Sequence, residues 1–276
     1  MSAPFLAHID WSRPWLTPYR EIGQAVQTAP DWRAALNAAA QQRDLRNHQG
    51  LPIHFVAQSD LLPAIAYEAF ISASGGVPTR DNLHDFFNAL VWLTFPHIKR
   101  QLNALQAAEI ARTLTRNEAA GQPIVRGKLR DAATIFDENA ALLVTTDRHI
   151  LEDLRAHCWQ QALLEQRSAW GITIEASLFG HALMEKLVTP YKAITAHAWT
   201  LIVAPEYFTQ PPAARIAWLD TALAQRLAQG VTNADFTPLP VLGVPGWWEG
   251  QDAAFYADVA VFRPKRVAGM THGVVC

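Results

Sequence analysis

The stretch RDNLHDFFNALVWLTFPHIKRQLN, residues Arg80–Asn103, carries the clearest structural signal in this chain of 276 residues. Apolar residues recur there every three or four positions, which predicts an amphipathic helix from about Pro78 to Phe95. Proline cannot continue a helix but suits the first position of the next one, so a second helix is expected to begin at Pro96. Two helices separated by a proline are therefore the starting point for the predicted fold.

The polar face of the first predicted helix is the main candidate for a functional site. His84 and Asn88 stand four residues apart, which places their side chains next to each other on a helix. Nearby carboxylates could orient the imidazole as a general base. Alternatively, the same residues form a capped helix start with a solvated face. The residues predicted to be catalytic are His84, Asp85, Asn88 and Asp137.

Four further residues are predicted to bind a substrate. Trp92 continues the polar stripe with an aromatic ring, which is typical of a pocket wall that carries a few convergent polar groups. Arg80, Lys99 and Asn103 could bind an anionic group, or could instead tie the two helices together. The candidate site therefore extends from the first helix to the second.

A second pair of polar residues points to a metal. His181 and Glu185 have the same spacing of four on a short predicted helix, and imidazole with carboxylate is a half-site for Zn²⁺, Mn²⁺ or Fe²⁺. A catalytic metal needs about three protein ligands, and His84 could supply the third. Because the spacing itself reveals only two ligands, a His–Glu pair that merely stabilises the helix is the alternative. A divalent metal is thus a candidate cofactor, with His84, His181 and Glu185 as predicted ligands.

The rest of the chain predicts an α+β fold that is mostly helical, with helices packed around a small sheet or hairpin. Residues 132–136 and 141–145 are expected to be strands joined by a hairpin turn at 137–140, where carboxylates commonly form turns. Other predicted strands lie at 53–56, 172–178 and 196–203, and other predicted helices at 31–46, 64–72, 147–167, 181–188 and 211–230. We expect one compact domain over residues 1–276, with a loop at 117–128, an irregular N-terminal wrap at 1–30 and an irregular Pro/Gly/Trp-rich segment at 236–276.

Composition narrows the functional classes. Half of the residues are hydrophobic and 17% are charged, as in globular proteins, and the formal net charge of -2 makes a nucleic-acid partner unlikely on electrostatic grounds. No Walker loop or G-x-G-x-x-G motif occurs, so no nucleotide cofactor is expected. Two cysteines are too few for a disulfide framework, and neither a signal peptide nor an apolar run of about 20 residues is present. These features predict a cytoplasmic protein without a membrane partner.

Four motifs are spread over most of the chain: PTRDNLHDFFNALVWLTFP (Pro78–Pro96), RDAATIFDEN (Arg130–Asn139), FGHALMEK (Phe179–Lys186) and PLPVLGVPGWW (Pro238–Trp248). Together they resemble a bacterial family catalogued as domain of unknown function 3025. One departure is Ala140, where the resemblance leads us to expect a glycine. The resemblance implies a shared architecture and brings no established activity.

Three functional hypotheses follow. The first is an enzyme, a hydrolase or lyase that acts on a small molecule by His/carboxylate acid–base chemistry or by metal-assisted hydrolysis. The second is a non-catalytic protein that binds a small molecule or a protein through its tryptophan-rich loops. The third is a nuclease or nucleic-acid modifier, which the net charge disfavours. Substrate, reaction and oligomeric state are left open by the sequence.

Overall fold

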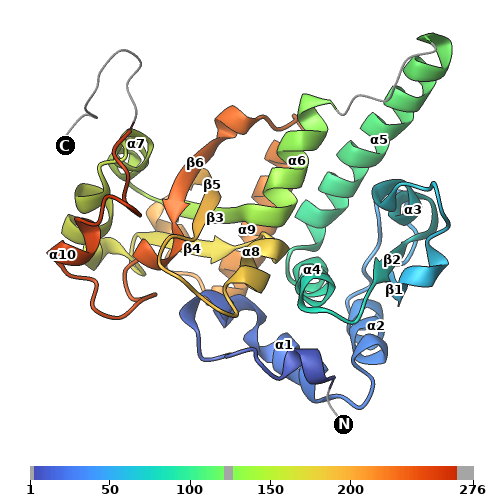
Figure 1. Cartoon of the computed structure of the whole chain (residues 1–276), viewed down its shortest axis with the longest axis horizontal. Coiled ribbons are helices and arrows are strands. Elements are labelled where there is room, and N and C mark those ends of the chain that lie inside the picture. The colour runs from blue at the N-terminus through green and yellow to red at the C-terminus, as the bar shows by residue number, and fades with distance from the viewer. Residues whose placement is uncertain (1–2, 121–126, 266–276) are drawn as a thin grey trace.

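The computed structural model describes residues 3–120 and 127–265, and its central feature is a four-stranded sheet with the order β4-β3-β5-β6 (Figure 1). β3 (Ala140–Thr145) is antiparallel to β4 (Ile174–Leu178) and parallel to β5 (Thr195–Ile202), and β6 (Phe236–Pro240) is antiparallel to β5. All 6 residues of β3 are buried, as expected for an apolar strand that is covered on both faces. The sheet is thus the inner layer around which the helices pack.

A second, two-stranded sheet and a set of helices complete the architecture. β1 (His54–Ala57) and β2 (Gly76–Thr79) pair in parallel. In Figure 1, α3 and α5 lie at one end of the molecule, and α7 and α10 lie at the other. The helices are α1 (Arg20–Thr28), α2 (Trp32–Gln42), α3 (Tyr67–Ser74), α4 (Leu83–Thr94), α5 (Pro96–Ala120), α6 (Lys128–Asn139), α7 (Arg148–Ala156), α8 (His181–Lys186), α9 (Pro212–Leu227) and α10 (Ala253–Tyr256). This arrangement confirms the predicted α+β class.

α4 is the helix predicted from the opening stretch, but it begins later and is buried more completely than predicted. Pro78 and Thr79 belong to β2, and the Asn82 side chain caps the helix by accepting the backbone N–H of Asp85 at 2.8 Å. Every residue from 85 to 93 is buried, so a solvated polar face is restricted to the start of the helix, where Asp81 is exposed and the His84 side chain is 28% exposed. The reason is tertiary, since α8 packs against the polar side of α4.

α5 begins at Pro96, as predicted, and its first turn is capped from a distant helix. The carboxylate of Asp220 in α9 accepts the backbone N–H of His97 at 2.9 Å and that of Ile98 at 2.8 Å. A carboxylate at a helix start is favourable because the first N–H groups have no partner within the helix. α5 continues to Ala120, which corrects the first part of the loop predicted at 117–128. The rest of that loop prediction, up to residue 126, lies outside the described residues.

The hairpin predicted around residues 137–140 is wrong, because α6 runs through this segment to Asn139 and leads directly into β3. Buried residues in α6 occur as two adjacent pairs one helical turn apart, which is the pattern of an amphipathic helix rather than of a strand. Ala140 has φ -81° and ψ 147°, an extended conformation that requires no glycine. The buried residues of α6 are Ala132, Ala133, Phe136 and Asp137.

Other differences concern the ends of predicted elements. The helix predicted at 147–167 ends at Ala156, because His157 takes a left-handed conformation with φ 64°, and a π-helical segment follows at Gln160–Glu165. The N-terminal wrap contains α1, and the C-terminal segment predicted to be irregular contributes β6 and α10. The predictions of β4, β5, α8 and α9 are confirmed to within a few residues.

Within the described parts of the chain, no helix combines the length and the apolar character that crossing a bilayer would require. The buried aromatic residues instead gather between the sheet and the helices. Phe136 of α6 stacks on Phe179 with a ring distance of 4.8 Å, and Trp199 of β5 meets Phe136 edge to face at 5.0 Å. This aromatic packing fixes the end of α6 against the start of α8, which is where the candidate site lies.

Candidate functional site

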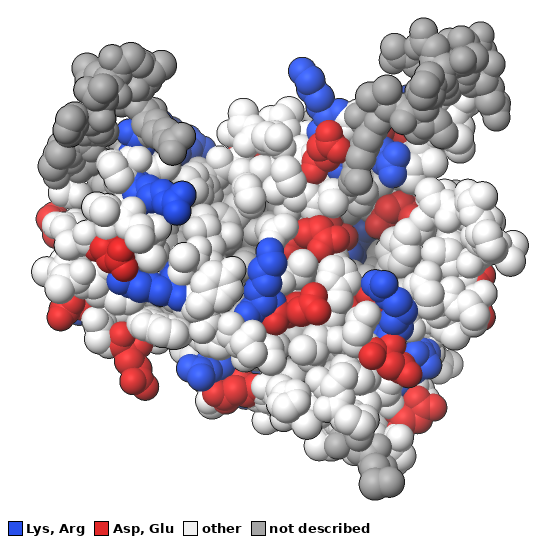
Figure 2. Space-filling view, in the orientation of Figure 1, with Lys and Arg blue, Asp and Glu red and all other residues white. Residues whose placement is uncertain are grey.

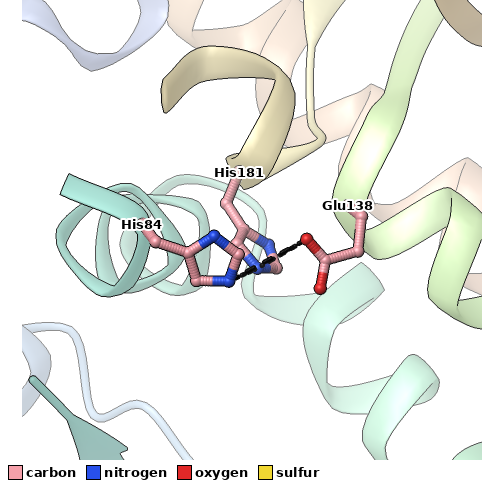
Figure 3. Close-up of side chains that lie close together, drawn as sticks. All are labelled: His84, Glu138 and His181. Carbon is pink, nitrogen blue, oxygen red and sulfur yellow. Dashed lines mark hydrogen bonds and ion pairs between the residues drawn. The ribbon is translucent and has the colours of Figure 1, made fainter. Parts of the chain in front are cut away.

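Three side chains with metal-binding atoms converge where α4, α6 and α8 meet (Figure 3). His84 comes from the start of α4, Glu138 from the end of α6, and His181 is the first residue of α8. The two histidine Nε2 atoms are 3.1 Å apart, and Glu138 Oε2 lies 3.5 Å from His181 Nε2 and 3.9 Å from His84 Nε2. Their ligand atoms all lie within 4.8 Å of one another. We call these three residues the His–Glu cluster.

A glycine allows α8 to start against the end of α6. The backbone N–H groups of Phe179 and Gly180 both donate to the carbonyl of Ala140, at 3.0 and 2.9 Å. A Cβ on Gly180 would lie 2.5 Å from backbone atoms of Glu138, Asn139 and Ala140, far inside van der Waals contact. Since φ is -61°, this position needs glycine for space and not for backbone conformation. The close approach brings His181 next to Glu138.

Each histidine of the cluster has a carboxylate on its outer side. His84 Nδ1 lies 3.1 Å from Glu185 Oε2, and His181 Nδ1 lies 4.0 Å from Asp137 Oδ1. Both rings therefore turn Nε2 toward the cluster and Nδ1 toward an acidic side chain. Glu185, which was predicted to share a metal with His181, contacts the Nδ1 atom of His84, on the side opposite to the Nε2 atoms. Glu138 occupies the position beside the Nε2 atoms.

A buried hydrogen-bond network supports the cluster from the side of α5. Lys99 Nζ donates to Asp137 Oδ1 at 2.6 Å and to Asn88 Oδ1 at 2.8 Å, and Asn88 Nδ2 donates to the Tyr67 hydroxyl at 2.9 Å. The Lys99 side chain is 3% exposed and that of Asp137 is 11% exposed. An ammonium group this deep requires a paired carboxylate, because an isolated buried charge is very costly. We call Tyr67, Asn88, Lys99 and Asp137 the lysine network.

The site opens to solvent on one side. The side chains of His84 and Glu138 are 28% and 31% exposed, whereas that of His181 is 5% exposed. Figure 2 shows acidic and basic side chains together near the centre of this face, in the region where α6 and α8 meet. A small ligand could therefore reach His84 and Glu138, while His181 forms the buried wall.

The structure brings together most of the predicted site residues but separates others from the cluster. His84, Asn88, Lys99, Asp137, His181 and Glu185 are linked through the contacts described above. Asp85 is occupied with Arg80, accepting its backbone N–H at 2.7 Å and both guanidinium contacts at 2.9 Å.

The two remaining predicted substrate-binding residues have partners inside the protein. Trp92 is 1% exposed, and the Lys99 ammonium lies 5.4 Å from the centre of its ring. Asn103 is also 1% exposed and donates to the backbone carbonyl and the carboxylate of Glu68, at 2.9 and 2.8 Å. Substrate contact by Lys99, Trp92 or Asn103 stays a prediction, and their burial makes these residues supports of the site.

Sequence reasoning missed Glu138 and Tyr67. Glu138 is absent from the predicted site, which includes its neighbour Asp137, because carboxylates at the tip of a predicted hairpin usually form the turn. The helical pattern of Ala132, Ala133 and Phe136 was the signal that could have found it, since a helix presents Asp137 and Glu138 on its last turn near the following strand. Nothing in the sequence pairs Tyr67 with Asn88, because the two residues lie on different helices, α3 and α4, which β2 separates along the chain.

Burial and neighbouring charges shift the titration of the cluster. Burial lowers the pKa of His181 to about 3, so the ring is neutral at physiological pH. The pKa of Glu138 is raised, mainly by burial and secondly by the negative charge of the nearby Asp137. Burial alone would raise the pKa of Asp137, but Lys99 and His181 outweigh it and hold that pKa below its ordinary range. A neutral imidazole beside carboxylates is the form that binds a metal ion.

The pKa of His181 predicts an acid sensitivity of the metal-free protein. The unfolded state takes up a proton on this residue near pH 6.5 and the folded state only near pH 3, so stability is lost as the pH falls through this window. At pH 5 the loss attributable to His181 should reach about 2 kcal/mol. Urea denaturation at pH 7 and pH 5 measures it, and the loss should shrink in His181→Gln. Equal losses in both proteins would contradict the assignment.

A shallow surface depression of about 470 Å³ lies elsewhere on the molecule. Its lining includes Arg13, Trp247 and Trp248, together with Pro14 and Pro190. Trp15 lies behind it, 6.0 Å from the Trp247 ring. None of its lining residues belongs to the His–Glu cluster or to the lysine network. The tryptophans that the sequence suggested for ligand binding are thus separate from the candidate catalytic residues.

The fold and the cluster describe an α+β protein with a histidine–carboxylate site between three helices. The model of one family, described as a protein of unknown function (DUF3025), matches residues 53–266, and the chain belongs to this family. The match includes every residue of the His–Glu cluster and of the lysine network. Comparisons with curated proteins and with solved structures found no match.

Proposed function

We propose that this protein is a metal-dependent hydrolase of a small molecule, with one divalent cation bound by His84, Glu138 and His181. The convergence of three ligand atoms supports this proposal. Metal–ligand distances of about 2.0–2.1 Å in a tetrahedral site separate neighbouring ligand atoms by about 3.3–3.4 Å. The separations of 3.1, 3.5 and 3.9 Å in the cluster bracket this value. Little movement would be needed to bind the ion.

The charge of the surroundings also favours a divalent cation. Among the described residues, the carboxylates of Asp137, Glu138 and Glu185 lie beside the two histidines, and of these three acids only Asp137 forms an ion pair with a lysine, Lys99. A divalent cation between the histidines would offset negative charge of the other two acids. Zn²⁺, Mn²⁺ and Fe²⁺ all accept imidazole and carboxylate ligands.

Three protein ligands and partial exposure are typical of catalytic sites, because a structural zinc site uses four protein ligands. A bound cation lowers the pKa of its water and polarises the oxygen of a substrate. In hydrolysis such a water would supply its oxygen to the substrate carbonyl or phosphoryl centre as the bond to the leaving group breaks, and the proton that the water loses would pass to the leaving group. Glu185 holds His84 in the orientation that this site needs.

Metal titration of the purified protein tests the proposal. Wild-type protein stripped with a chelator should bind one Zn²⁺ or Mn²⁺ ion, and affinity should fall more than about 100-fold in His84→Ala, Glu138→Gln and His181→Ala, beyond the effect of outer-shell changes. His149→Ala is the matched control, because His149 also contacts a glutamate at 3.3 Å but is 83% exposed on α7. Its metal affinity should equal that of the wild type.

Activity provides the second half of the test. A panel of carboxyl esters, amides and phosphate monoesters should include a compound that the metal-loaded wild type hydrolyses and the His84→Ala variant does not. Absence of stoichiometric metal binding would refute the proposal. Binding of iron with oxygen-dependent turnover would also refute it, since two histidines and one carboxylate are the ligand set of non-haem iron oxygenases.

Ligand binding without catalysis is a second candidate, supported by the depression at Trp247 and Trp248. Its volume of about 470 Å³ lies within the range of small-molecule pockets. In that case Trp247→Ala would abolish ligand binding, and the cluster variants would leave it unchanged.

A further inference from the structure

We infer that Asp137, fixed in place by Lys99, is the positioning residue that orients His181 for the cation. This inference rests on the proposed function and assigns the lysine network to the metal site. Asp137 does not face the ion in this arrangement. It acts through the imidazole of His181, from the side opposite to the ligand nitrogen.

The rings of the two histidines in the cluster are oriented in the same way. His84 has Nε2 toward the cluster and Nδ1 at 3.1 Å from Glu185, and His181 has Nε2 toward the cluster and Nδ1 facing Asp137. Histidines that bind metals almost always donate the other ring N–H to a carboxylate or carbonyl group, which sets the tautomer and the ring orientation. Asp137 therefore has the same role for His181 that Glu185 has for His84: each carboxylate faces the Nδ1 atom of its histidine.

The carboxylate of Asp137 is held in place by Lys99. Lys99 Nζ lies 2.6 Å from Oδ1, the same oxygen that faces His181, and a second bond from Lys99 to Asn88 ties this ammonium group to α4. Asn88 in turn is bonded to Tyr67 of α3. Four helices thus determine where the Asp137 oxygen lies. A carboxylate with this many fixed neighbours can impose an orientation on the ring beside it.

The distance from His181 Nδ1 to Asp137 Oδ1 is 4.0 Å, and Nδ1 is buried without a well-formed hydrogen bond among the described residues, although the backbone of Asp137 approaches the ring closely enough to raise its pKa. A cation on Nε2 requires the proton to be on Nδ1, because a neutral imidazole carries only one. A buried N–H that donates to nothing costs about 1–3 kcal/mol. Asp137 supplies the nearby acceptor, and a shift of the ring toward it on metal binding removes this cost.

The test must separate positioning from stability, since removing one member of a buried ion pair destabilises the fold. We choose the double variant Lys99→Met/Asp137→Leu, which removes the acceptor together with its ammonium partner. Asn47→Leu is the control, because Asn47 is a buried polar residue, 1% exposed, whose side chain donates to the backbone carbonyls of Ile71 and Ser72 instead. Zn²⁺ affinity is measured by chelator competition, and the His181 tautomer by ¹H–¹⁵N spectra of its ring.

The double variant should bind Zn²⁺ about 10–100-fold more weakly than the wild type, the usual effect of losing an outer-shell partner. The protected Nδ1 proton of zinc-loaded His181 should also disappear from its spectrum. Asn47→Leu should retain both the affinity and the proton signal. Unchanged affinity and an unchanged signal in the double variant would overturn this inference. Zinc binding by the wild type would in that case still support the proposed function. Failure of the wild type to bind any metal would refute both.

Discussion

Replacement of Lys99 by methionine is expected to lower the free energy of unfolding by about 3–5 kcal/mol, because it leaves a buried carboxylate without its partner. Lys99 is 3% exposed, and its ammonium group lies 2.6 Å from Asp137 and 2.8 Å from Asn88. Methionine fills similar space but offers no charge and no hydrogen-bond donor. Chemical denaturation at pH 7 measures the change.

Two variants make this prediction specific. Lys192→Met removes the partner of Asp258 in an ion pair of 2.7 Å, close to the 2.6 Å of the buried pair, whose side chains are 28% and 38% exposed. Surface pairs contribute about 0–1 kcal/mol, so this control should change stability little. The double variant Lys99→Met/Asp137→Leu should recover part of the loss, because no Asp137 carboxylate is left without its partner, whereas Glu68 still loses the favourable charge of Lys99. Equal losses for the two lysine variants would show that burial of the ion pair does not determine its contribution.

Gly180→Ala is the second change with a large expected effect, a loss of about 3 kcal/mol through overpacking. The added methyl group would lie 2.5 Å from the backbone of Glu138, Asn139 and Ala140. Backbone atoms cannot rotate away as a side chain can, so α8 must move from the end of α6. The same movement separates His181 from Glu138, and metal affinity should fall together with stability.

Gly246→Ala is the matched control for this substitution. An added Cβ there meets no atom within 4 Å, although φ is +83° and the backbone is unfavourable for alanine. Its expected cost is about 1 kcal/mol, and metal affinity should be unchanged. Thermal or urea unfolding compares the two variants. Wild-type metal affinity in a stable Gly180→Ala protein would show that the close approach of α6 and α8 does not set the cluster.

The sequence predicted the elements that local chemistry decides. Pro96 starts α5 because proline fits the first turn and cannot lie within the preceding helix. Asp31 caps α2 by accepting the N–H of Ala34, as its residue type indicates. The short helix that begins at His181 was predicted from local residues too, and the set of predicted helices and strands indicated the α+β class. Each of these elements depends on residues within a few positions of one another.

The wrong prediction of a strand at residues 132–136 explains why Glu138 is missing from the predicted site. With a strand at residues 132–136, the carboxylates that follow it are expected to lie in a hairpin turn. In the structure this segment is the helix α6, whose buried stripe packs on Phe179 and Trp199. A short apolar run satisfies either period, and long-range packing decides between them. Glu138 was lost from the candidate site for this reason.

The sequence by itself determined which residues had the chemistry for a site: His84 and Asn88 on one helix, and His181 and Glu185 on another. Only the tertiary structure decided which of them meet. His84 and His181 are 97 residues apart, and Glu138 joins them because the start of α8 fits against the end of α6 at Gly180. Spacing along a helix fixes which side chains share a face, whereas contact between helices depends on the packing of the whole core. The helix at residues 83–94 is thus one wall of a site whose other two walls come from α6 and α8.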